Sequence, residues 1–122
     1  MADILIIDDD AGIRRLLGAA LRKAGHSVRV AADGADGVAE YRARPADVVI
    51  TDVYMPRQDG IETIQQLRDE FPDSRILAIS GGAAQGANAP LKDAELFGAN
   101  ATLAKPFTME RLVRAVSGLL GK

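Results

Sequence analysis

Five polar side chains in this sequence follow short apolar runs, at positions where strands of a parallel sheet would end. Asp8 and Asp9 follow the run ILII, and Asp52 follows the run VVIT. Further along, Ser80 follows ILAI and Lys105 follows ATLA. Oxygen ligands without histidine or cysteine favour a hard divalent cation, for which Mg²⁺ is the natural candidate. Carboxylates, a metal ion, a hydroxyl and an ammonium together suit the transfer of a dianionic phosphoryl group.

The elements that must position these groups alternate between β-rich and amphipathic runs. We expect five strands, at Ile4–Asp8, Val28–Ala31, Val48–Asp52, Ile76–Ser80 and Ala101–Ala104. Three of them are continuously apolar, as is typical of parallel strands covered on both faces, whereas Val28-Arg29-Val30 alternates in the manner of an edge strand. Short strands that alternate with helices predict a parallel sheet with helices on both faces.

Five amphipathic segments are expected to form the helices. The first has an apolar face of Ile13, Leu16, Leu17, Ala20, Leu21 and Ala24, and it ends at Gly25. Its arginines Arg14, Arg15 and Arg22 are expected to form a solvated face, and Asp10 is expected to be its N-cap. The other expected helices are Ala35–Arg44, a stripe from Ile61 to Phe71, Lys92–Phe97, and a last helix with Thr108 as its N-cap.

Ligands of open α/β sheets bind at the carboxyl ends of the strands, near the point where the strand order reverses. If the first and third strands are neighbours, they lie about 5 Å apart, and Asp8, Asp9 and Asp52 meet in one crevice. Like charges at that distance raise one another's pKa unless a cation neutralises them. Lys105 would add a fixed positive charge beside the metal.

Composition excludes several other classes of protein. With 48% hydrophobic and 26% charged residues in 122, the chain has the balance of one globular domain, residues 1–122. A net charge of −2 gives no electrostatic basis for direct binding to nucleic acid. There is no cysteine, which excludes disulfides, thiolate metal sites and thiol nucleophiles. Neither a signal peptide nor a membrane-spanning run is recognisable, so we expect a cytoplasmic protein without membrane contact.

Four motifs, in order along the chain, carry a family resemblance: IIDDD, TDVYMPRQDG, IS at the end of the fourth strand, and AKPF. Together they resemble the response-regulator receiver domains of two-component signalling, over essentially the whole chain. The resemblance implies a flavodoxin-like α/β fold, with a five-stranded parallel sheet in the order 2-1-3-4-5 and five helices on both faces.

The resemblance also implies a role for each strand-end residue. Asp52 corresponds to the phosphoacceptor, a carboxylate nucleophile that forms an acyl phosphate. Ser80 and Lys105 correspond to the hydroxyl and the ammonium that bind phosphoryl oxygens, and the Lys105-Pro106 bond corresponds to one that is often cis. The implied ligands of Mg²⁺ are Asp8, Asp9, Asp52 and the backbone carbonyl of Tyr54.

We therefore expect a signalling switch that receives its phosphoryl group from a histidine kinase or a histidine phosphotransfer protein. Its output would be a downstream protein target or a fused output domain, and its only catalysis its own phosphorylation and dephosphorylation. One alternative is an interaction module with the receiver fold that is never phosphorylated, although such a module would not need the complete set of strand-end residues. Another is an aspartyl-phosphate phosphatase, but position 54 is Tyr where such an enzyme needs a second, acid/base Asp.

Three features depart from the family pattern. Thr102 occupies the position, three residues before the lysine, where receivers usually carry an aromatic switch residue. The connection from Ser80 to Lys105 is long, with its excess in the segment Gly81–Pro90. Tyr54 and Gly82 flank the acceptor and are expected to tune the access of water to it. Without an aromatic switch, we expect phosphorylation to order Gly81–Pro90 and the following helix.

Overall fold

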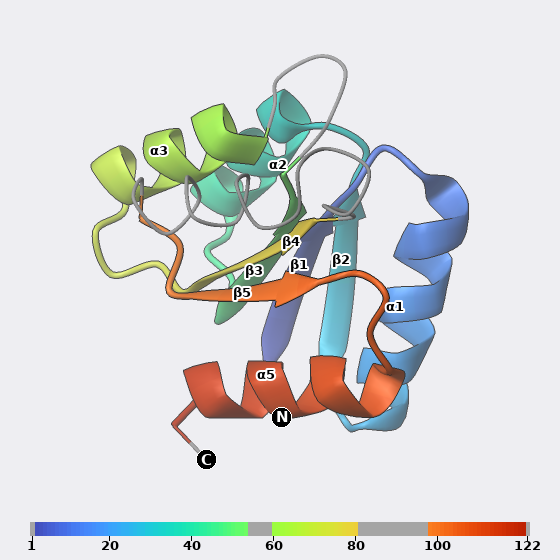
Figure 1. Ribbon diagram of the computed structural model, residues 1–122. Helices are drawn as coiled ribbons and strands as arrows, with labels where there is room; N and C mark the ends of the chain where they lie inside the picture. The colour runs from blue at the N-terminus through green and yellow to red at the C-terminus, as the bar shows by residue number, and fades with distance from the viewer. Residues whose placement is uncertain (1, 54–59, 81–97, 122) are drawn as a thin grey trace.

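The computed structural model describes residues 2–53, 60–80 and 98–121, which form a parallel sheet between two layers of helices (Figure 1). The strands are β1 (Asp3–Ile7), β2 (Ser27–Ala31), β3 (Val48–Asp52), β4 (Ile76–Ser80) and β5 (Ala101–Ala104). Their order in the sheet is β2-β1-β3-β4-β5, and every neighbouring pair is parallel. The predicted order 2-1-3-4-5 is confirmed, and β2 is an edge strand, as its alternating sequence indicates.

Four helices are described, two on each face of the sheet. They are α1 (Ala11–Lys23), α2 (Gly34–Ala43), α3 (Gly60–Glu70) and α5 (Met109–Leu119). In Figure 1, α2 and α3 lie above the sheet, and α1 and α5 cover its other face. The expected helix Lys92–Phe97, the segment Gly81–Pro90 and Tyr54 lie outside the described residues. No helix in the described part of the chain is long and apolar enough to cross a membrane.

Burial on both faces explains why the central strands are continuously apolar. In β1, Leu5 and Ile7 pack toward α2 and α3, whereas Ile4 and Ile6 pack toward α1 and α5. All four side chains are fully buried. Because successive side chains of a strand point to opposite faces, a strand covered on both sides has few positions for polar side chains between its ends. The polar residues that bracket the buried run of β1 are therefore Asp3 at its start and Asp8 directly after its carboxyl end.

Two predicted caps fix the helices next to the candidate site. Asp10 is the N-cap of α1, and its side chain accepts hydrogen bonds from the backbone N–H groups of Gly12 and Ile13. Thr108 is the N-cap of α5, and its hydroxyl accepts from the N–H of Arg111 at 3.1 Å. Such caps satisfy N–H groups that have no partner within the helix. Both helices consequently begin directly after the strand ends.

The structure corrects two expectations about α1. Leu16, which was expected in the apolar face, is 52% exposed, because Leu17 and Leu21 are the residues that α1 directs at the sheet. Arg14, which was expected to be solvated, is only partly exposed, and its guanidinium turns back toward the start of the helix. Leu16 and Arg14 thus lie outside the face of α1 that packs against the sheet through Leu17 and Leu21.

Candidate functional site

Three carboxylates converge where the order of the strands reverses. Ile7 of β1 is in register with Thr51 of β3, so the residues that follow the two strands meet at the same edge of the sheet. One carboxylate oxygen from each of Asp8, Asp9 and Asp52 can be chosen so that the three atoms lie within 4.8 Å of one another. Two oxygens on opposite sides of one Mg²⁺ are roughly 4 Å apart, so small side-chain rotations would let all three ligate one ion. The predicted meeting of these three acids is confirmed.

Each acid of this cluster has a different environment. Asp8 is buried, Asp52 is partly exposed and Asp9 is exposed. Burial raises the pKa of Asp8 to about 6, and the charges of Asp52 and Asp9 add to the rise. A hydrogen bond of 2.9 Å from the backbone N–H of Asp10 to Asp8 Oδ1 lowers this pKa in part. An ionised acid in this position needs a nearby cation, so the set of donors suits a hard divalent ion.

Lys105 brings a positive charge to the same place from the far side of β4. Ser80, the last residue of β4, is paired with Ala104, so Lys105 follows immediately beyond the strand ends. Its Nζ lies 3.6 Å from Asp52 Oδ2. The Lys105-Pro106 peptide bond is cis, as expected. The ammonium and the carboxylates of Asp8 and Asp9 therefore approach Asp52 from different sides.

The backbone places Ser80 next to Asp52. Ile79 is in register with Asp52 across β3 and β4, and Ser80 is one residue further on. The role of its hydroxyl stays a prediction, as does that of the Tyr54 carbonyl, which lies outside the described residues. Thr102 lies on β5, in register with Ala78. The position three residues before the lysine is therefore part of the sheet, with a small polar side chain.

Arg14 and Gly60 contact the backbone of the site, although neither of them was assigned to it from the sequence. Arg14 Nη1 donates a hydrogen bond of 2.7 Å to the carbonyl oxygen of Asp8. The N–H of Gly60 donates to the carbonyl of Val53 at 2.8 Å, and a Cβ on Gly60 would overlap the carbonyl oxygen of Asp52. The sequence offered one signal for Gly60, because it is the last residue of the acceptor motif TDVYMPRQDG. Nothing in the helical pattern distinguished Arg14 from Arg15.

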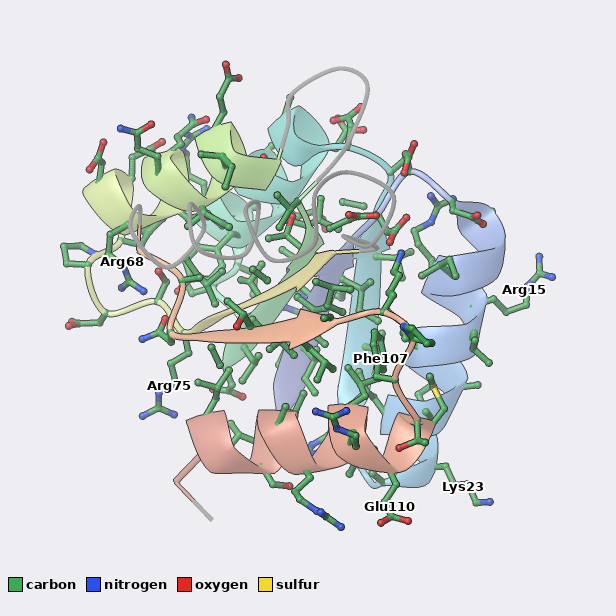
Figure 2. All side chains as sticks on the ribbon, in the orientation of Figure 1. Arg15, Lys23, Arg68, Arg75, Phe107 and Glu110 are labelled. Atoms are coloured by element: carbon green, nitrogen blue, oxygen red, sulfur yellow. The ribbon has the colours of Figure 1, made fainter. Side chains whose placement is uncertain are left out.

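An apolar hollow adjoins the ammonium end of the site. It has a volume of about 230 Å³ and lies between α1 and the turn from β5 to α5, where Phe107 is located (Figure 2). Its lining is Ile13, Leu16, Leu17, Lys105, Pro106, Phe107 and Met109. The exposed Leu16 and the candidate phosphoryl-binding Lys105 thus share one surface depression.

Comparison with known proteins identifies this arrangement. The response regulator receiver domain matches residues 4–117 of the chain. The chain belongs to this family. It is 37% identical over 119 residues to a Rhizobium etli protein described as a probable chemotaxis protein CheY, covering 97% of this chain and 92% of that protein. It is 36% identical over 117 residues to the response regulator MprA of a Mycobacterium species, covering 96% of this chain but only 50% of MprA.

Solved structures agree with the family membership. The chemotaxis protein CheY4 of Vibrio cholerae superposes with a TM-score of 0.88 at 30% sequence identity, covering 98% of each chain. The chain is therefore a receiver domain of two-component signalling, a class of phosphorylation-dependent switches.

Proposed function

We propose that Asp52 accepts a phosphoryl group, with Mg²⁺ held by Asp8, Asp9 and Asp52, and that the acyl phosphate changes the affinity of the chain for a protein partner. The observation that carries the proposal is the convergence of the three carboxylates with Lys105, whose Nζ lies 3.6 Å from Asp52 Oδ2. A nucleophilic carboxylate flanked by a cation site on one side and an ammonium on the other suits phosphoryl transfer.

In the proposed reaction, a carboxylate oxygen of Asp52 attacks the phosphorus of a phosphohistidine on the donor. The new O–P bond forms as the N–P bond breaks, and the imidazole leaves with the electron pair and takes up a proton. The bound cation supplies positive charge that offsets the charge of the phosphoryl oxygens. Lys105 holds the acceptor before transfer, and afterwards its ammonium needs only a short movement to pair with a phosphoryl oxygen.

This exchange of partners by Lys105 is the core of the proposed switch. Before transfer its ammonium is paired with Asp52, and its side chain is 30% exposed beside the apolar hollow. A dianionic phosphoryl group attracts the ammonium more strongly than one carboxylate, so the lysine and the adjoining turn favour a different position after transfer. The chain catalyses, in this proposal, only its own phosphorylation and dephosphorylation.

The partners follow from the same site. The donor would be a histidine kinase or a histidine phosphotransfer protein, as membership of the receiver family suggests, and the hollow beside Lys105 would take part in docking. The output would be a downstream protein or an output domain on the same chain. MprA, of which this chain covers half, is about twice as long.

The direct test is the mass of the intact chain after incubation with Mg²⁺ and acetyl phosphate. We expect one phosphate adduct on the wild type and none on Asp52→Asn, since the amide removes the nucleophile and preserves the shape. Asp36→Asn, at an exposed position in the first turn of α2, is the matched control and should keep the adduct. A wild type without an adduct would favour the unphosphorylated interaction module, and an adduct on Asp52→Asn would place the acceptor elsewhere.

A further inference from the structure

Arg14 and Arg15 are adjacent on α1 but differ in what they contact. Arg14 Nη1 lies 2.7 Å from the carbonyl oxygen of Asp8, and the hydrogen bond between them is partly buried. Arg15 is exposed, and Figure 2 shows its side chain extending away from α1. Two residues of the same type and charge therefore give a natural comparison between a bound and a solvated guanidinium.

The bond from Arg14 fixes the peptide unit that joins the first two acids of the site. A peptide unit is planar, so the direction of the Asp8 carbonyl also sets the orientation of the Asp9 N–H and the position of the Asp9 Cα. Asp9 is the exposed acid of the cluster, with the least packing to hold it. The direction in which its carboxylate leaves the backbone thus depends on the plane that Arg14 holds.

Other bonds hold the rest of this short segment. The N–H of Asp8 donates to the carbonyl of Ala31 at 3.1 Å, and the N–H of Asp10 donates to Asp8 Oδ1 at 2.9 Å. Asp10 is in turn held as the cap of α1. Among these described hydrogen bonds, the one that the Asp8 carbonyl oxygen accepts is donated by Arg14. Removing the guanidinium would free the central peptide unit while both ends of the segment stay anchored.

We propose that Arg14 is a positioning residue of the metal site: by holding the Asp8 carbonyl, it orients the Asp8–Asp9 peptide unit so that both carboxylates face one cation. The inference rests on the proposed binding of Mg²⁺ by Asp8, Asp9 and Asp52. Arg14 binds neither the cation nor the phosphoryl group in this role. It acts as the outer hydrogen-bond partners of metal ligands do, by fixing ligand geometry before the metal arrives.

Removal of the Arg14 guanidinium changes Mg²⁺ affinity in opposite directions for a positioning role and for a purely electrostatic role. A guanidinium close to the site repels a divalent cation, so its removal would strengthen Mg²⁺ binding if charge were its main effect. Loss of positioning would weaken Mg²⁺ binding. The sign of the change in affinity therefore decides between the two roles.

The test is a Mg²⁺ titration, followed by amide NMR shifts, of wild type, Arg14→Met, Arg14→Lys and Arg15→Met. Methionine keeps much of the apolar stem and removes the donors, and the two Met variants lose the same formal charge. We expect Arg14→Met to bind Mg²⁺ about tenfold more weakly, as is common when an outer partner of a metal ligand is lost. Arg15→Met should bind within about twofold of wild type, and Arg14→Lys, which keeps a long donor and the charge, should recover part of the loss.

Thermal unfolding of each variant, with titrations well below the midpoint, separates this role from a general loss of stability. If Arg14→Met is not folded, the Mg²⁺ affinities of Arg14→Lys and Arg15→Lys are compared instead. A lower Mg²⁺ affinity of Arg14→Lys than of Arg15→Lys supports the proposal. Equal affinities in that pair, or an Arg14→Met that binds as tightly as Arg15→Met or more tightly, would overturn it. A wild type that does not bind Mg²⁺ at millimolar concentrations would overturn the proposed function as well.

Discussion

Asp8 shows how one residue couples the stability of this domain to its site. Its carboxylate is 3% exposed and lies beside two other acids. Burial raises its pKa to about 6, against 3.8 for a free aspartate. The folded protein therefore binds a proton at Asp8 more tightly than the unfolded chain does, and a cation at the site competes with that proton. Proton binding, metal binding and folding are linked at this side chain.

In metal-free buffer, we expect the free energy of unfolding to fall as the pH rises from about 4 to above 6. Below 3.8 Asp8 is protonated in both states and its contribution is complete. Between the two pKa values the unfolded chain loses the proton first, so the folded state is progressively penalised, by on the order of 2 to 3 kcal/mol once both states are ionised. Urea titrations in EDTA across this pH range measure the effect.

Asp8→Asn is the matched control for this pH dependence. It should lack most of the decline between pH 4 and 7, while titrating groups remote from the cluster of acids contribute equally to both proteins. Saturating Mg²⁺ should raise the stability of wild type at pH 7 and leave Asp8→Asn nearly unchanged. If the free energy of unfolding in EDTA depended on pH in the same way for both proteins, ionisation of Asp8 would not be the cause of the decline.

At the scale of elements, the site depends on helices that begin against strand ends. The first residue of α3 is Gly60, whose Cα lies against the backbone of Asp52 and Val53. On α2, Gly37 lies against the side chain of Ile7. Both glycines let a helix approach β1 or β3 closely. They differ in what a methyl group added to each would displace. A methyl group on Gly60 would displace the backbone of Asp52, whereas one on Gly37 would displace the flexible side chain of Ile7.

We expect Gly60→Ala to slow phosphorylation by acetyl phosphate at least several-fold, and Gly37→Ala to change it little. The new Cβ at position 60 can be accommodated only if α3 or the Asp52 backbone moves, whereas Ile7 can change its rotamer at a cost in stability. The rate of appearance of the phosphate adduct measures the effect. Thermal unfolding checks that both variants are folded during the assay. Equal phosphorylation rates in two folded variants would show that the contact with α3 does not position Asp52.

At the scale of the whole molecule, the described residues include two large hydrophobic side chains that are exposed, in contrasting locations. Leu16, 52% exposed, lines the hollow beside Lys105, and Val30, 46% exposed, lies on the edge strand β2. Val30 is not among the residues that line this hollow, so the two positions separate the hollow from the edge of the sheet. A donor that docks over the hollow would cover Leu16 and leave Val30 free.

We expect Leu16→Asp to slow phosphorylation by a histidine phosphotransfer protein at least tenfold, because the charge would be buried against the partner's apolar surface. Phosphorylation by acetyl phosphate should be unchanged, since that small donor needs no docking surface. Val30→Asp is the control and should affect neither reaction. If Leu16→Asp slows both donors equally, the substitution acts on Asp52 itself. If it slows neither, docking occurs elsewhere.

Features that depend on neighbours along the chain could be predicted from the residues alone. Continuous apolar runs identified buried parallel strands, and Asp10 and Thr108 were recognisable as caps because capping is a contact over two or three residues. The strand ends carried the candidate acids for the same local reason. The motifs at those ends also sufficed to indicate the family, from which the strand order was taken.

Contacts between side chains that are distant in the sequence could not be predicted without the packing of the folded chain. The reach of Lys105 to Asp52 past the end of β4 depends on pairing between strands far apart in the sequence. Which residues of α1 face the sheet depends on how the helix is rotated, and this exposes Leu16 although its spacing fits the apolar face. The turn of Arg14 back to the Asp8 carbonyl follows from the position of α1 beyond β1. Such contacts are set by packing, and helical periodicity does not distinguish a bound arginine from a solvated one.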